Sequence, residues 1–242
     1  MILPYEVRII LSLSNSQNFA IVSIFGNLLI VDSLTGVYKA TPKKVSERGE
    51  VDRPEIRFPE FNDAWEQRRL GDVSIKVTEK NVALEVTEAF TNSAEYGVVS
   101  QRDFFDKDIA RAESIGGYYI VRCEDFVYNP RISTLASVGP INRNKLGRAG
   151  VMSPIYTVFR INDDVENTFL EQYFKSCHWH AFMKLNGDSG ARSDRFSIKD
   201  SVFFEMPIPL PHHNEQQSIG GFLSNLDTLI ALHQREPRED SE

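Results

Sequence analysis

The stretch Phe126–Asn162, FVYNPRISTLASVGPINRNKLGRAGVMSPIYTVFRIN, contains no aspartate or glutamate, although the 242-residue chain is acidic, with a net charge of -7. The turn-forming residues of Asn144–Gly150 predict an exposed loop held between two strands. Guanidinium and amide groups close together supply phosphate contacts and base-edge hydrogen bonds, which are the two ingredients of duplex recognition. The alternative is a solvated basic loop on an ordinary domain. The cations of this basic window are Arg131, Arg143, Lys145, Arg148 and Arg160.

Charge changes sign along the chain on either side of the basic window. Residues 51–125 hold 16 acidic against 10 basic residues, and residues 212–242 hold six against two. The net negative charge argues against nonspecific coating of nucleic acid, but a polarised field is compatible with a specific reader. Hydrophobic residues make up 41% of the chain and aromatic residues 11%, which is enough for a sizeable core.

The first fifty residues differ in character from the rest. The apolar run Phe19–Val31 is too short for a membrane span and is interrupted by Gly26-Asn27, so it predicts a β-hairpin. Residues 41–59 have the charge and proline content of a linker. Only two cysteines occur, Cys123 and Cys177, which fits a reducing cytoplasm rather than a disulfide scaffold.

From Pro59 onward the pattern is that of a mixed domain. Trp65, Leu70 and Val73 predict a short opening helix that Gly71 ends. Strands are predicted from β-branched and aromatic content at 82–86, 96–100, 118–121 and 150–161.

A helix is predicted from Asn167 or Thr168 to Ala181, with Cys177 in its core-facing stripe. Within it, Cys177-His178-Trp179-His180 suggests a metal site only superficially. Zinc ligands on one helix need to lie about a turn apart, and these positions point in different directions.

Two further segments follow this helix. Residues 186–195, NGDSGARSDR, form a polar glycine-rich loop in which the backbone can approach a phosphate closely. The alternating prolines of Met206–Pro211 exclude a helix and predict an edge strand or a polyproline spacer.

The last predicted element is an amphipathic helix over 214–234. Each glycine of the pair Gly220-Gly221 weakens an isolated helix by roughly 1 kcal/mol, so a partner surface is expected, either in its own domain or on another helix. The packing residues are predicted to be Ile219, Phe222, Leu223, Leu226, Leu229 and Ile230.

These elements predict an α/β fold of α+β type. We expect residues 1–53 to be an N-terminal segment of hairpin plus linker, and residues 54–211 to be the main domain of mixed strands and helices. Residues 212–236 are expected to form the C-terminal amphipathic helix, and 237–242 a frayed tail.

Four stretches carry a resemblance to a known family: Phe58–Asp72 (FPEFNDAWEQRRLGD), Gly187–Ile198 (GDSGARSDRFSI), Ile208–Ile219 (IPLPHHNEQQSI) and Gly221–Gln234 (GFLSNLDTLIALHQ). Residues Pro59–Glu236 resemble the specificity subunit of type I restriction-modification systems. The resemblance implies a target recognition domain of α/β character attached to long helices that form a coiled-coil spacer.

In that family two recognition domains each read half of a split site on double-stranded DNA. The helices dock modification subunits, which bind S-adenosylmethionine and methylate adenine, and a separate restriction subunit uses ATP to translocate and cut. The resemblance therefore implies no catalysis and no cofactor or metal in this chain; S-adenosylmethionine, ATP and Mg²⁺ would belong to the partners. The sequence departs from the pattern in carrying one recognition domain, a helix of about 24 residues and an unrelated segment before Pro54.

We expect the basic window and the glycine-rich loop to line one concave surface that faces DNA. A half subunit could pair with a second copy, or with another half specificity subunit, to rebuild a two-fold arrangement. The predicted DNA-contacting residues are Arg131, Asn142, Arg143, Asn144, Lys145, Arg148, Lys184, Arg192, Ser193 and Arg195.

Two other functions compete with DNA recognition by this chain. An enzyme that methylates adenine would carry an Asn/Asp-Pro-Pro-aromatic motif, of which Tyr128-Asn-Pro-Arg131 has only the first half. No carboxylate cluster suited to Mg²⁺ stands out in the sequence. A truncated or silent cassette, in contrast, would act only as a protein-interaction module through the 214–234 helix. The DNA target, the role of residues 1–53 and the oligomeric state cannot be read from the sequence.

Overall fold

The computed structural model describes residues 57–105, 115–188 and 194–235, with side chains of the last helix to Leu232, and the backbone of three strands near the N-terminus. The chain divides into two compact units, with the three strands in the first. Strands β1 (Glu6–Ser12), β2 (Phe19–Phe25) and β3 (Leu28–Ser33) form an antiparallel sheet in that order. The predicted hairpin around Gly26-Asn27 is confirmed by the pairing of Phe25 with Leu28. The predicted linker up to residue 56 and the predicted tail lie outside the described residues.

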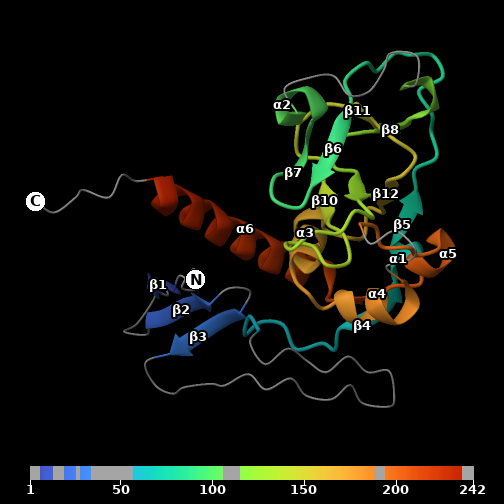
Figure 1. The fold of residues 1–242 in the computed structure, drawn as a ribbon. Helices are drawn as coiled ribbons and strands as arrows, with labels where there is room; N and C mark the ends of the chain where they lie inside the picture. Colours follow the sequence, from blue (N-terminus) through green and yellow to red (C-terminus); the bar gives the residue numbers. More distant parts are fainter. Residues whose placement is uncertain are drawn as a thin grey trace, which may run out of the picture. The chain divides into compact units, whose positions relative to one another are not determined.

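The second unit mixes short strands and helices (Figure 1). Three small two-stranded ladders, β11–β8, β13–β4 and β6–β7, surround a four-stranded antiparallel sheet of order β10-β9-β12-β5. In Figure 1, α4, α5 and β4 lie at one end of this unit, and α2 with the β6–β7 hairpin at the other. The elements are β4 (Glu66–Arg69), α1 (Leu70–Val73), β5 (Ser74–Lys76), β6 (Phe90–Ser93), β7 (Gly97–Ser100), α2 (Gln101–Phe105), a 3₁₀ turn (Ile115–Gly117), β8 (Tyr119–Val121), β9 (Phe126–Tyr128), β10 (Ile141–Arg143), β11 (Gly150–Met152), β12 (Thr157–Ile161), α3 (Asn167–Lys175), α4 (His180–Asn186), α5 (Asp200–Phe203), β13 (Pro207–Leu210) and α6 (His213–Arg235).

Strand β9 lies at the centre of the packing because both of its faces are buried. Phe126 and Tyr128 point into the larger core, which helices α3, α4 and α5 cover, while Val127 points into a smaller core with β6, β7, β8 and β11. Strand β12 repeats the alternation, with Phe159 in the larger core and Val158 in the smaller one. A period of two with apolar residues on both faces is what a sheet buried between two layers requires.

The first and the last described strands of the second unit pair with each other. Strand β4 is antiparallel to β13, with Glu66 opposite Leu210 and Arg69 opposite Pro207. The predicted edge strand at 206–211 is therefore confirmed. The predicted opening helix is wrong in extent: residues 66–69 are a strand, and the helix is the single turn α1, which includes Gly71 rather than ending there.

The predicted helix over 167–181 is two helices. α3 begins after its N-cap, Glu166, and ends at Lys175, and α4 begins at His180. In the break Trp179 takes the buried position and its indole N–H donates to the carbonyl of Phe174. Cys177 is exposed, so the prediction that it packs in the core is wrong.

Two strand predictions also need correction. Residues 82–86 form no strand; Asn81 instead bonds through its side chain to both backbone groups of Val86 and holds a turn. Residues 150–161 form two strands in different sheets, β11 and β12, separated by a turn at Ser153–Tyr156. The strands predicted at 96–100 and 118–121 are present as β7 and β8.

Helix α6 packs first on its own domain. Gly220 lies against Thr168 and Phe169 at the start of α3, and farther along Leu226 is buried. Figure 1 shows the later turns of α6 extending past α3. There, Phe222, Leu229 and Leu232 remain between 39% and 56% exposed.

No helix within the described residues is long and apolar enough to cross a membrane.

The two adjacent glycines of α6 give opposite predictions. A Cβ on Gly220 would lie 2.5 Å from Thr168 Oγ1 and 2.7 Å from the backbone nitrogen of Phe169, so Gly220→Ala requires α6 to move off α3. We expect it to lower the free energy of unfolding by about 1–3 kcal/mol. Nothing lies within 4 Å of a Cβ on Gly221, so Gly221→Ala should raise that free energy by about 0.5–1 kcal/mol. Urea unfolding of both variants would measure this; equal effects would contradict the close contact.

Candidate nucleic-acid interface

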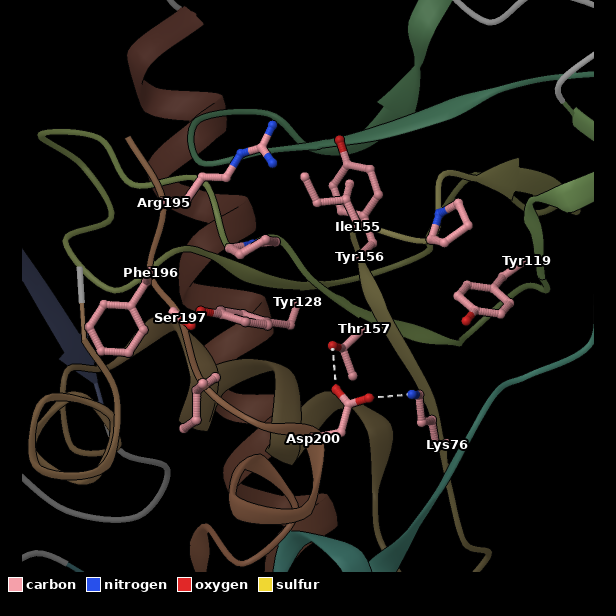
Figure 2. Close-up of a pocket in the computed structure, with 13 residues that line it drawn as sticks. Lys76, Tyr119, Tyr128, Ile155, Tyr156, Thr157, Arg195, Phe196, Ser197 and Asp200 are labelled. Carbon is pink, nitrogen blue, oxygen red and sulfur yellow. Dashed lines mark hydrogen bonds and ion pairs between the residues drawn. The ribbon is translucent and has the colours of Figure 1, made fainter. Parts of the chain in front are cut away.

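A cavity of about 430 Å³ lies where the segment before α5 crosses β9 and β12 (Figure 2). Its lining combines aromatic rings from several elements with two cations. Because every element that contributes is held by the sheet or its cores, the rings are positioned without the aid of a ligand. The lining residues are Lys76, Tyr119, Tyr128, Pro130, Pro154, Ile155, Tyr156, Thr157, Arg195, Phe196, Ser197, Ile198 and Asp200.

One of the two cations in this pocket is already neutralised. Asp200 accepts hydrogen bonds from the Lys76 ammonium and, at 3.2 Å, from the Thr157 hydroxyl. Figure 2 shows these two bonds on one side of Tyr128 and Arg195 on the other. The Tyr128 hydroxyl donates to the carbonyl of Val138 at 2.9 Å, and burial raises the pKa of Tyr128. Tyr128 therefore serves as a neutral, fixed wall.

The structure brings Arg131 and Arg195 together. They face each other in an antiparallel bridge between the segment after β9 and the segment before α5. Arg131 is exposed, whereas the Arg195 side chain is 35% exposed. Arg192 and Ser193 lie outside the described residues.

Arg143 and Lys145 lie at the other end of β9. Arg143 of β10 is paired with Phe126, the first residue of β9. Arg131 lies three positions after Tyr128, the last residue of β9. The Arg143 side chain is 10% exposed and pairs with Glu124 at 2.6 Å and with Glu171 of α3. Lys145 binds the same Glu171 at 2.9 Å. Both charges are used to join the sheet to α3.

Arg148 and Arg160 also hold the domain together. Arg148 makes two hydrogen bonds to Glu88, at 2.7 and 2.8 Å, and these lower the pKa of Glu88. Arg160 likewise donates two hydrogen bonds to the fully buried carboxylate of Asp125. Acids from neighbouring segments therefore neutralise most cations of the basic window in the free protein, and the expected DNA-facing surface at these residues stays a prediction.

The amides of the two predicted asparagine readers are both bonded within the domain. Asn144 is fully buried, and its amide donates to the carbonyls of Arg122 and Arg148. Asn142 donates to the side chain of Asn92 at 2.7 Å. Neither amide can reach a base without breaking these bonds. Lys184 is exposed on α4, so contact with DNA at this position stays a prediction.

Sequence reasoning missed Asn92, Lys76 and Asp200. Asn92 is 1% exposed and its amide donates to the carbonyls of Val127 and Pro140, so it ties β6 to the sheet. No local pattern marks these residues, since each acts across a long sequence separation. The signal that could have located the pocket was the placement of Tyr128 and Tyr156 in the basic window. Within the described parts of the chain, no group of three or more His, Cys, Asp or Glu could hold a metal.

Comparison with known proteins identifies the family of the chain. The family described as "Type I restriction modification DNA specificity domain" matches residues 62–239. Because the match covers well over half of the chain, the chain belongs to this family. The described part of the matched region is a mixture of helices and strands followed by a C-terminal helix.

Two solved structures are similar to the chain. One is the HsdS subunit from Thermoanaerobacter tengcongensis, with 18% identity and a TM-score of 0.46 over 78% of this chain and 43% of that one. The other belongs to a study of "complex assembly and conformational transition of the type I R-M system", with 14% identity and a TM-score of 0.49 over 76% of this chain and 52% of that one. The chain thus spans about half the length of these two chains. No curated protein matched the sequence.

The buried Glu171 gives a prediction about stability. Its side chain is 11% exposed, and burial would raise its pKa, but the Lys145 hydrogen bond and the charges of Arg143 and Lys175 outweigh burial and lower it. Glu171→Gln leaves the buried Arg143 with Glu124 as its remaining carboxylate, so the loss of one charged partner should reduce the free energy of unfolding by about 1–3 kcal/mol. Urea unfolding at pH 7 measures the loss. Lys145→Gln, at an exposed partner, should cost about 1 kcal/mol or less.

The ion pair between Glu171 and Arg143 also predicts how the stability of the protein changes with pH. A carboxylate whose pKa is lowered on folding stabilises the protein above its unfolded value, and Glu171 starts from 4.5. The stabilisation from Glu171 should therefore be complete at neutral pH and be lost as the pH falls through the lowered pKa. The difference in stability between wild type and Glu171→Gln should shrink on acidification. A difference that stays constant down to pH 3 would contradict the assignment.

Proposed function

We propose that this chain recognises a specific sequence of double-stranded DNA as the specificity subunit, or a half subunit, of a type I restriction-modification complex. The family match over residues 62–239 carries the proposal. Adenine methylation would be performed by modification subunits, and cleavage by a restriction subunit joined through the complex, all in the cytoplasm. This chain would contribute no catalytic residue; S-adenosylmethionine, ATP and Mg²⁺ would be bound by the partners.

The pocket around Tyr128 and the neighbouring Arg131–Arg195 bridge support a DNA-facing surface at that end of β9. The loop between Asp188 and Asp194 carries Arg192 and Ser193, which remain proposed contacts. Lys184 also remains one. Residues Arg143, Lys145 and Arg148 would reach DNA only by giving up the ion pairs that they form in the free protein.

A direct experiment would co-purify the full chain with its modification subunit and select ligands from a random duplex library. We expect enrichment of duplexes that share one defined sequence element, with an affinity that falls as salt rises. Purified chain alone should neither methylate nor nick DNA. Recovery of the complex without enrichment of any duplex would contradict sequence recognition.

Helix α6 supplies the proposed assembly surface. Leu229 is 49% exposed and Phe222 is 39% exposed beside its edge-on contact with Phe58, whereas Ile219 and Leu226 pack on the domain. An exposed apolar stripe on a helix is suited to a second copy of this helix or to a helix of another subunit. This observation also favours the second candidate function, a cassette that binds proteins without reading DNA.

Replacing an apolar residue on that stripe should separate assembly from folding. Leu229→Glu places a charge on the exposed stripe and should weaken co-purification with the modification subunit at least tenfold, while thermal stability changes little. Ala231→Glu adds the same charge at an exposed position on another face of α6 and should leave assembly unchanged. Equal co-purification of both variants would remove α6 from the proposed interface.

A further inference from the structure

The Arg131–Arg195 bridge has a defined geometry. The amide of Ile132 donates to the carbonyl of Asp194 at 3.0 Å, and the amide of Phe196 donates to the carbonyl of Pro130 at 2.8 Å. These two bonds flank the arginines, so the arginines are the non-hydrogen-bonded type of antiparallel pair. In such a pair the Cα atoms approach to about 4.5 Å, and both side chains leave the ladder on the same side.

Like charges placed directly opposite each other destabilise a ladder. Elsewhere in the basic window the structure avoids this cost, because Arg143, Arg148 and Arg160 each have a carboxylate within 2.7 Å. Among the described residues the Arg131 guanidinium has no ion-pair partner, and Arg195 has only Asp194, whose carboxylate is 3.9 Å from its Nε. That Nε is buried and makes no hydrogen bond.

We propose that Arg131 and Arg195 form a binding site for one phosphate, and that the phosphate is a backbone phosphodiester of the DNA that the domain reads. The identity of the phosphate rests on the proposed function. Guanidinium groups match phosphate oxygens with paired hydrogen bonds, and two that start about 4.5 Å apart can reach the same group. The anion neutralises a repulsion that the protein leaves uncompensated.

In the pocket beside the pair, the anion is expected to bind at Arg195 and not at Lys76. Of the two cations that line the pocket, Lys76 is paired with Asp200, so Arg195 carries the available positive charge. The side chains of Ile155 and Tyr156 lie beside Arg195 and offer apolar surface there, whereas Tyr119 lies on the far side of the pocket (Figure 2). A phosphate contact of this kind fixes the position of the protein on the duplex and carries no sequence information itself.

The first test measures DNA binding by the full chain with its modification subunit. Arg131→Gln, Arg195→Gln and the double variant are compared on a selected duplex and on a random one, with Arg69→Gln as a control. The Arg69→Gln variant loses the same kind of charge, but Arg69, which lies on β4, is paired with Glu205. We expect the double variant to bind both duplexes more weakly by a similar factor, and to reduce the slope of log affinity against log salt by about one. A slope equal to that of the control would overturn the site.

The second test needs no DNA. Thermal midpoints are measured at low ionic strength with increasing inorganic phosphate. Wild type should gain stability with phosphate, and the double variant should gain less. Without phosphate the double variant should melt no lower than wild type, because the repulsion is gone. A double variant that melts lower without phosphate and responds to it as wild type does would contradict an anion site.

The two tests separate the proposals. If wild type responds to phosphate through the pair but the complex enriches no duplex, the anion site stands and DNA is not its source. If the complex reads a duplex and neither salt slope nor phosphate response depends on the pair, the proposed function stands and this site is wrong.

Discussion

The buried carboxylate of Glu171 joins the layers of the recognition domain. It lies on α3 and binds Arg143 of β10, Lys145 after that strand, and Lys175 one turn along its own helix. Lys175 in turn binds Asp227 of α6 at 2.6 Å. One continuous set of charges therefore runs from the sheet through α3 to the C-terminal helix. Helix α6 contacts the domain chiefly through α3, and the Lys175–Asp227 pair adds a charged contact to the packing of Gly220 on that helix.

This network explains why local charge counting misleads. The basic window contains no acid, but Glu124 and Asp125 directly precede it, and Glu88 and Glu171 reach it from distant segments. An acid-free stretch can thus be electrically balanced in the folded protein. The cations that remain available are defined by the absence of a nearby carboxylate in space, which sequence composition cannot reveal.

The same contrast between local and distant interactions separates the predictions that succeeded from those that did not. The hairpin at Gly26-Asn27, the proline-rich strand β13 and the helix α6 follow from turn residues, prolines and periodicity close together in the chain. The break between α3 and α4 does not, because Trp179 is buried there at the expense of helical continuity. Likewise, residues 66–69 are extended because β13 pairs with them from 140 positions away, a contact that local propensity cannot anticipate.

The candidate site also depends on a contact between segments that are distant in the sequence. Family resemblance located the loop that carries Arg195, and composition located Arg131, but only the fold shows that the two are directly opposite each other. A domain that neutralises Arg143, Arg148 and Arg160 with well-placed carboxylates, yet among its described residues leaves two facing arginines with no carboxylate closer than 3.9 Å, is less stable at that point than its own chemistry allows. Such local instability is expected where a protein is adapted to a ligand rather than to its free state, because the ligand supplies the missing charge on binding.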